Sequence, residues 1–90
     1  MNSDLVEAAT LILTRAEIFH DSIRNELFKY YRSQKQPIPR KAVYHLIMET
    51  TRRQNLLDEY LKFVSGEKIF KFDPFLVNLL RVVTYILKEE

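Results

Sequence analysis

The chain contains no cysteine, one glycine and three prolines. Without cysteine, it can form neither disulfides nor thiolate nucleophiles nor cysteine metal sites. Its longest apolar runs are far shorter than the roughly 18 residues that a membrane-spanning helix needs, and no basic-then-apolar leader opens the sequence. We therefore expect a cytoplasmic protein that neither crosses a membrane nor is exported.

Motifs for catalysis are also scarce. His20 and His45 fall on different expected helices, and neither begins a metal-binding spacing such as HExxH. The adjacent carboxylates Asp58 and Glu59 diverge by about 100° on a helix, which does not suit a paired-carboxylate site. There is also no glycine-rich phosphate loop. We therefore expect no catalytic residue, no bound metal, no cofactor and no enzyme activity in this chain.

Apolar residues make up 47% of the 90 residues and recur at helical spacing along most of the chain. Pro39 opens one helix, and Gly66 falls where a helix end needs a left-handed residue. A turn or kink near Arg53 is expected, with Asn55 capping the next helix, although the apolar period runs through this point. The expected helices cover about residues 4–19, 23–31, 39–52, 55–64 and 74–87. The predicted fold class is all-α, a compact bundle of about five helices in a single domain, residues 1–90.

The segment FDPFLVNLLRVVTYIL has the clearest helix signal in the chain. Asp73 can cap the first amides, and Pro74 has its φ preset for the first helical position. Apolar doublets then form a wide buried face. The narrow outer strip that remains is Val77, Arg81, Thr84 and Lys88. Within such apolar surroundings, Arg81 is expected to pair with a carboxylate such as Asp58 or Glu49 rather than with RNA.

Charge is unevenly distributed although the total is only +2. Residues 1–26 have a balance of −3, residues 27–57 one of +6, and the remainder one of −1. A basic middle segment suits an anionic partner such as nucleic acid, because phosphate contacts supply much of the affinity. Tyr30, Tyr31 and Tyr44 within it could stack on unpaired bases. The alternative is that the cations are ordinary solvated side chains and the tyrosines are half-buried core residues.

Two segments resemble a known family. LIMETTRRQNLLDEYL combines a leucine-rich helix, an arginine-bearing turn and a Leu-Leu-Asp-type helix, and DPFLVNLLRVVTYIL follows at a fitting separation. Together, residues 43–87 resemble the C-terminal half of the NusB-like all-helical domain, whereas the N-terminal half fits only as a pattern of helices. This domain occurs as the antitermination factor NusB and as the N-terminal domain of Sun/RsmB-type RNA 5-methylcytosine methyltransferases.

The resemblance is closer to the methyltransferase-associated form. The chain starts with the acidic MNSDLVE, where NusB has an arginine-rich arm that contacts RNA. Val83 replaces a family glycine, and Met48 and Glu49 replace a frequent Tyr-Gly pair, which implies a slightly different packing distance between helices. The catalytic domain of those enzymes is absent from this sequence, so we expect it to act in trans or within a longer parent chain.

The resemblance implies a non-catalytic RNA-binding domain that positions structured ribosomal or transfer RNA. Arg52 and Arg53 correspond to the family's basic turn. Arg40 and Lys41 stand in the first turn of a helix, where cations oppose the helix dipole by a few tenths of a kcal/mol, which indicates a role other than stability. The expected RNA-binding residues are Lys29, Tyr30, Arg32, Lys35, Arg40, Lys41, Tyr44, Arg52 and Arg53.

A protein-interaction module without direct RNA contact is the alternative function. NusB-type domains also pair with protein partners, and Phe70 and Phe72, which we expect to be exposed, would offer a hydrophobic groove. A homodimer that forms through Phe70 and Phe72 is a further alternative. The two hypotheses differ in their salt dependence, which is steep for RNA binding and weak for an apolar interface.

Overall fold

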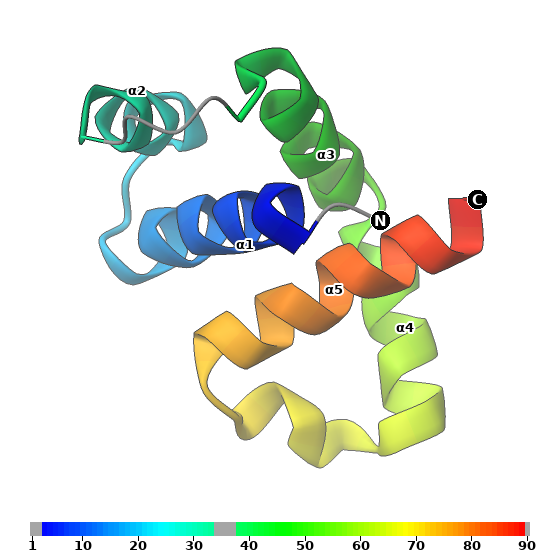
Figure 1. Cartoon of the computed structure of the whole chain (residues 1–90). Helices are drawn as coiled ribbons and strands as arrows, with labels where there is room; N and C mark the ends of the chain where they lie inside the picture. Colours follow the sequence, from blue (N-terminus) through cyan, green and yellow to red (C-terminus); the bar gives the residue numbers. More distant parts are fainter. Residues whose placement is uncertain (1–2, 34–37, 90) are drawn as a thin grey trace.

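The computed structural model describes residues 3–33 and 38–89 and shows, within them, five α-helices and one short 3₁₀ helix without a strand (Figure 1). The elements are α1 (Ser3–Ile18), α2 (Ile23–Ser33), α3 (Arg40–Arg52), α4 (Gln54–Ser65), η1 (Glu67–Lys71) and α5 (Pro74–Glu89). The predicted fold class, an all-α bundle of about five helices, is therefore confirmed.

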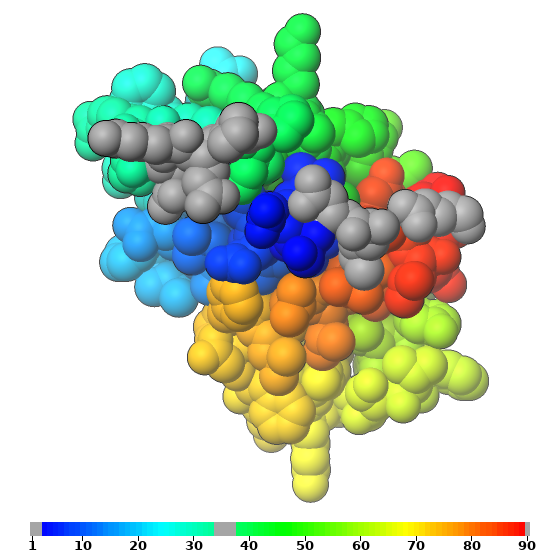
Figure 2. Space-filling model, in the orientation of Figure 1, coloured from blue at the N-terminus to red at the C-terminus, as the bar shows by residue number. Residues whose placement is uncertain are grey.

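α1 lies at the centre of the bundle, with α2 and α3 on one side and α5 on the other (Figure 1). The space-filling view shows the same order, with α1 in blue between the cyan-to-green layer of α2 and α3 and the orange α5 (Figure 2). Ala8 and Ala9 of α1 are buried, and their small side chains let the neighbouring helices approach closely. The buried members of the main core are Val6, Ala8, Ala9, Ile12, Leu27, Val43, Leu46, Ile47 and Val82.

α4 and η1 cover the other side of α5. Leu57 and Leu61 of α4, Ile69 of η1 and Val77 of α5 are buried in this part of the molecule. The sequence did not predict η1, because one 3₁₀ turn is too short to show a hydrophobic period. The Cα radius of gyration is 12.8 Å, close to the value of about 12 Å typical of a compact chain of this length.

Most helix boundaries follow cap signals in the sequence. α1 ends before His20, whose φ of 51° is left-handed. Ser22 caps α2, because its Oγ accepts a hydrogen bond (3.0 Å) from the backbone N–H three residues later. As predicted, Asp73 caps α5 by accepting a hydrogen bond from the Phe75 N–H at 2.8 Å, and Gly66 ends α4 with a φ of 81°.

The chain breaks between α3 and α4 at Arg53 as predicted, but the predicted cap at Asn55 is wrong. α4 begins at Gln54, and Arg53 is the residue between the two helices, with φ −100° and ψ 11°. The Arg53 N–H still donates to the Glu49 carbonyl, and the Arg53 carbonyl accepts from the Leu57 N–H. Helical hydrogen bonding is therefore hardly interrupted, which explains why the apolar period runs through the junction.

The exposed side of α5 differs from the predicted outer strip. Val77, expected to face outward, is 5% exposed, whereas Leu76 is 40% and Leu87 67% exposed. The reason is that α5 packs against α1 and α3 on one side and against α4 and η1 on the other. Arg81 of the predicted strip faces α4, where it pairs with Asp58, and the predicted carboxylate pairing of Arg81 is thus confirmed.

Among residues 3–33 and 38–89, no helix has both the length and the apolar character that a membrane crossing requires.

Candidate nucleic-acid interface

A groove of about 680 Å³ lies between α2 and α3. Arg24 and Leu27 of α2 and Arg40, Lys41 and Tyr44 of α3 line it. Leu27 is only 3% exposed and belongs to the core, whereas the three cations and Tyr44 are exposed. This α2–α3 groove therefore combines an apolar base with a cationic rim.

Contacts of Tyr31 fix the start of α3 against α2. The Tyr31 hydroxyl donates a hydrogen bond to the Ile38 carbonyl (2.8 Å), and the Arg40 guanidinium lies 5.8 Å from the centre of the Tyr31 ring. Tyr30 packs edge-on against Tyr31, with the ring centres 5.2 Å apart. Partial burial raises the pKa of the Tyr31 hydroxyl, so it remains a neutral hydrogen-bond donor. These contacts set the position of Arg40 and Lys41 relative to α2.

The cations of the groove carry uncompensated charge. Within residues 3–33 and 38–89, no carboxylate lies at ion-pair distance from Arg24, Arg40 or Lys41. The first turn of α3 contains no acidic residue, and Pro39 at its N-cap has no side-chain oxygen to accept from the first amides. Cations and open amides at a helix start both attract an anion, so the rim of the groove suits phosphate.

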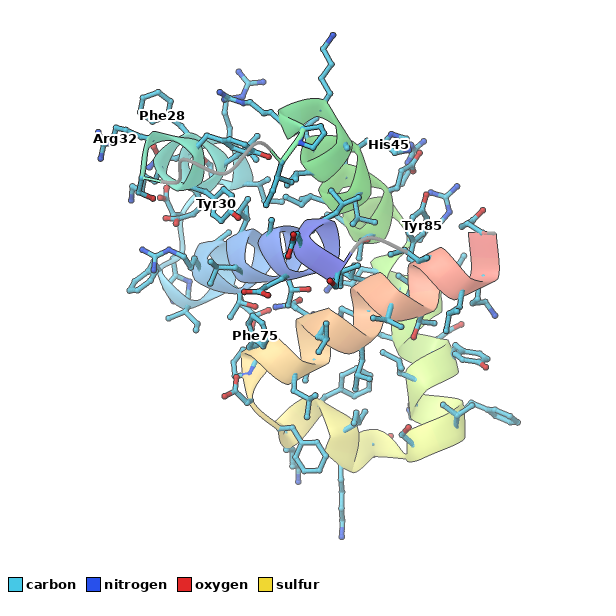
Figure 3. The ribbon with its side chains drawn as sticks, in the orientation of Figure 1. Phe28, Tyr30, Arg32, His45, Phe75 and Tyr85 are labelled. Atoms are coloured by element: carbon cyan, nitrogen blue, oxygen red, sulfur yellow. The ribbon has the colours of Figure 1, made fainter. Side chains whose placement is uncertain are left out.

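Phe28 and Arg32 continue the exposed side of α2 beyond Arg24. The three residues follow one another at intervals of four, so they lie along one side of the helix. Phe28 is half-exposed, and the Arg32 guanidinium lies 5.7 Å from the centre of its ring. Figure 3 shows Phe28 and Arg32 on the outer side of α2, whereas Tyr30 points towards α1. Arg32 therefore adds a cation further along the side of α2 that carries Arg24, and Phe28 adds an accessible aromatic ring.

Lys29 and Tyr30, both expected to bind RNA, lie away from the groove. The Lys29 Nζ is 3.3 Å from a carboxylate oxygen of Asp21 and of Glu26, and hydrogen bonding to these two residues raises the pKa of Lys29. Lys29 and Tyr30 line a separate cavity of about 280 Å³ between α1 and α2, together with Glu26 and Arg15. The charge of Lys29 is therefore balanced locally.

Arg52 and Arg53 lie at the end of α3 away from the groove and have acidic partners. The Arg52 guanidinium is 2.7 Å from a Glu49 carboxylate oxygen, which Arg53 also contacts. Arg53 pairs with Glu89 as well (3.0 Å) and lies 5.4 Å from the centre of the Tyr85 ring. Hydrogen bonding from Arg53 lowers the pKa of Glu49. Arg53 therefore joins α3 to α5, and Arg52 is the more exposed of the two arginines.

Arg24 was not among the expected RNA-binding residues, although the sequence contains a signal for it. Arg24 belongs to the segment of residues 1–26, whose net charge is negative, so it was not grouped with the basic middle segment. Its spacing of four residues from Phe28 nevertheless indicates that Arg24 and Phe28 lie on the same side of one helix. Lys35, also expected to bind RNA, lies outside the described residues. The expected RNA-binding residues that line the groove are Arg40, Lys41 and Tyr44, whereas Arg32 lies towards the other end of α2, beside Phe28.

The pair expected to contact a protein partner is only partly accessible. Phe72 is exposed, but Phe70 is partly buried, so the expectation that Phe70 is exposed is wrong. Phe70 is less accessible because η1 packs against α4 and α5. A larger apolar surface lies on α4, and we call it the α4 apolar face. Its exposed residues are Leu56, Tyr60, Phe63 and Val64.

Within the described ranges, no group of three or more histidine, aspartate or glutamate side chains is placed to hold a metal ion. No protein-family model, curated protein or solved structure matches the chain. The structure itself shows a small helical bundle with a cationic groove between α2 and α3.

Proposed function

We propose that this protein is a non-catalytic RNA-binding domain that positions structured RNA, similar to the NusB-like accessory domain of ribosomal or transfer RNA cytosine-5 methyltransferases. One observation carries the proposal. Arg24, Arg40 and Lys41 converge on one groove with no carboxylate partner among residues 3–33 and 38–89. A methyltransferase catalytic domain would act with it in trans or within a longer parent chain.

Docking on this surface would begin with the RNA backbone. Phosphates bound by lysine or arginine release counterions, which makes binding weaker as salt rises. Together with Arg32, which lies on the same side of α2 as Arg24, the three groove cations predict a slope of about −3 in a plot of log affinity against log salt. These phosphate contacts would orient the RNA, and the shape of the RNA would determine which RNAs bind tightly.

The test is binding of labelled ribosomal and transfer RNA fractions across a salt series. We expect Arg40→Glu/Lys41→Glu to weaken binding at low salt by about tenfold or more and to flatten the salt slope. The matched control is Lys68→Glu/Lys71→Glu, which makes the same charge change at two exposed lysines of η1. Equal loss in both variants would show that only total charge matters. If the wild-type protein binds no RNA even at low salt, the proposal is wrong.

The α4 apolar face supports a second candidate function, a protein-interaction module. Phe63 is 88% exposed and Leu56 is also largely exposed, on a helix whose opposite side is packed. Exposed apolar clusters of this kind often mark contact sites between proteins. Under this hypothesis, Phe63→Ser abolishes concentration-dependent association in sedimentation experiments at any salt concentration. Phe72→Ala, at a separate exposed aromatic residue, serves as the control.

A further inference from the structure

The α2–α3 groove has an apolar interior, which RNA phosphates bound to the cationic rim would not contact. Leu27 forms the base of the groove, and Tyr44 lines its α3 side. A double-stranded RNA helix offers phosphates, 2′-hydroxyls and base edges to a protein, but it keeps the flat faces of its bases stacked inside. A duplex docked on the cationic rim would therefore have no base face to place against the ring of Tyr44.

Unpaired nucleotides offer both kinds of contact. A base that is splayed out of a helix stacks on aromatic side chains and buries an apolar face, while its own phosphates remain available to nearby cations. The open groove, with a volume of about 680 Å³, has room for a nucleotide base. Tyr44 is 40% exposed and Phe28 is half-exposed, so both rings are accessible to a base.

We infer that the α2–α3 groove binds unpaired nucleotides of RNA. One base lies against the exposed ring of Tyr44, above the buried Leu27, and the flanking phosphates lie on Arg24, Arg40 and Lys41. Phe28, with Arg32 beside its ring, is the platform for a neighbouring base. This inference rests on the RNA-binding function proposed above and narrows its substrate class to loops, bulges and single strands of structured RNA.

The experiment measures fluorescence anisotropy of four labelled ligands with the full chain. The ligands are an unstructured RNA strand of about 12 nucleotides, a hairpin that carries an unpaired loop, a blunt RNA duplex, and a DNA strand of the same sequence. The duplex carries the most phosphate, so charge alone would make it the tightest ligand. We expect the opposite order, with the RNA strand and the hairpin binding at least about tenfold more tightly than the duplex.

A tyrosine variant tests the stacking contact itself. Tyr44→Leu keeps an apolar side chain but removes the ring, and it should weaken binding of the unstructured strand about tenfold while leaving duplex binding unchanged. Tyr60→Leu is the matched control, because Tyr60 is 43% exposed on α4, outside the groove. Circular dichroism would check that both variants remain folded.

The outcomes separate this inference from the function on which it rests. Duplex binding as tight as strand binding, unaffected by Tyr44→Leu, overturns the inference and leaves RNA binding in place. No binding of any RNA at low salt overturns both. Binding of the DNA strand as tight as the RNA strand, again weakened by Tyr44→Leu, supports a groove for unpaired bases but contradicts RNA as its specific ligand.

Discussion

The carboxylate of Asp58 on α4 accepts two hydrogen bonds from the guanidinium of Arg81 on α5, at 2.7 and 3.0 Å. The Arg81 side chain is only 11% exposed and also donates to the Asn78 side-chain oxygen at 3.0 Å. The Asn78 side-chain nitrogen in turn donates to the Thr14 hydroxyl of α1 at 3.2 Å. This chain of hydrogen bonds links the outer helix α4 to the central helix α1, so it fixes how α4 sits on the bundle.

The substitution Asp58→Ala should lower the free energy of unfolding by about 2 kcal/mol, because Arg81 loses both charged hydrogen bonds in a largely buried place. Urea denaturation followed by circular dichroism measures the change. Glu59→Ala, at the exposed neighbouring position, is the control and should stay within about 0.5 kcal/mol of the wild-type protein. An Asp58→Ala variant as stable as that control would contradict the structural role of this pair.

The stability of the fold in acid should depend on Asp21, in the turn before α2. Hydrogen bonding with Glu26, the backbone N–H of Ser22 and the side chains of Asn25 and Lys29 lowers the pKa of Asp21 from 3.8 to about 2. The unfolded chain has the ordinary, higher pKa, so the folded state favours the charged carboxylate. Asp21 therefore stabilises the fold fully above about pH 4 and loses this contribution as the pH falls towards 2.

The variant Asp21→Asn should accordingly be less stable than the wild-type protein at neutral pH, and the difference should vanish between about pH 4 and pH 2. Denaturant titrations at a series of pH values measure this difference directly. A difference that stays constant over the whole range would mean that Asp21 acts by hydrogen bonding alone and not through its charge.

The positions of the helices could be predicted because their signals are local. Asp73 and Gly66 mark helix ends by the preferences of their own side chains and backbones, and the apolar period marks what lies between. The packed side of α5 could not be predicted in the same way. Val77 is buried because α4 and η1 fold back over α5, and that arrangement depends on residues distant in the sequence.

The candidate site could be predicted only in part, for a similar reason. Arg40 and Lys41 are neighbours on one helix, so their common location was visible in the sequence. The pairs Glu26–Lys29 and Glu49–Arg53, three and four residues apart, were visible as well. The contacts of Lys29 with Asp21 and of Arg53 with Glu89 were not, because they depend on how the fold places residues that are further apart in the sequence. Asp21 lies in the turn before α2, and Glu89 is the last residue of α5.

The substitution Gly66→Ala should lower the free energy of unfolding by about 2 kcal/mol through backbone strain alone. Gly66 has φ 81° and ψ 170°, a region that only glycine adopts readily. Apart from the two chain neighbours, no atom of the described residues lies within 4 Å of the place that a Cβ would take, so steric collision with more distant residues does not contribute. Thermal unfolding would measure the effect, with Ser65→Ala as the neighbouring control. A Gly66→Ala variant with unchanged stability would show that the α4–η1 turn can relax to another conformation.

Loss of charge at Lys41 should affect RNA binding but not stability, whereas loss of charge at Arg53 should affect stability but not RNA binding. Lys41→Gln removes a cation at the groove rim, so it should reduce the salt slope of RNA binding by about one and leave the stability of the fold nearly unchanged. Arg53→Gln removes contacts to Glu49 and Glu89, so it should cost about 1 kcal/mol of stability while the salt slope stays the same. Parallel RNA-binding and urea-denaturation measurements on both variants separate the two roles. If Arg53→Gln reduces the salt slope as much as Lys41→Gln does, RNA reaches the far end of α3, and the interface is larger than the groove.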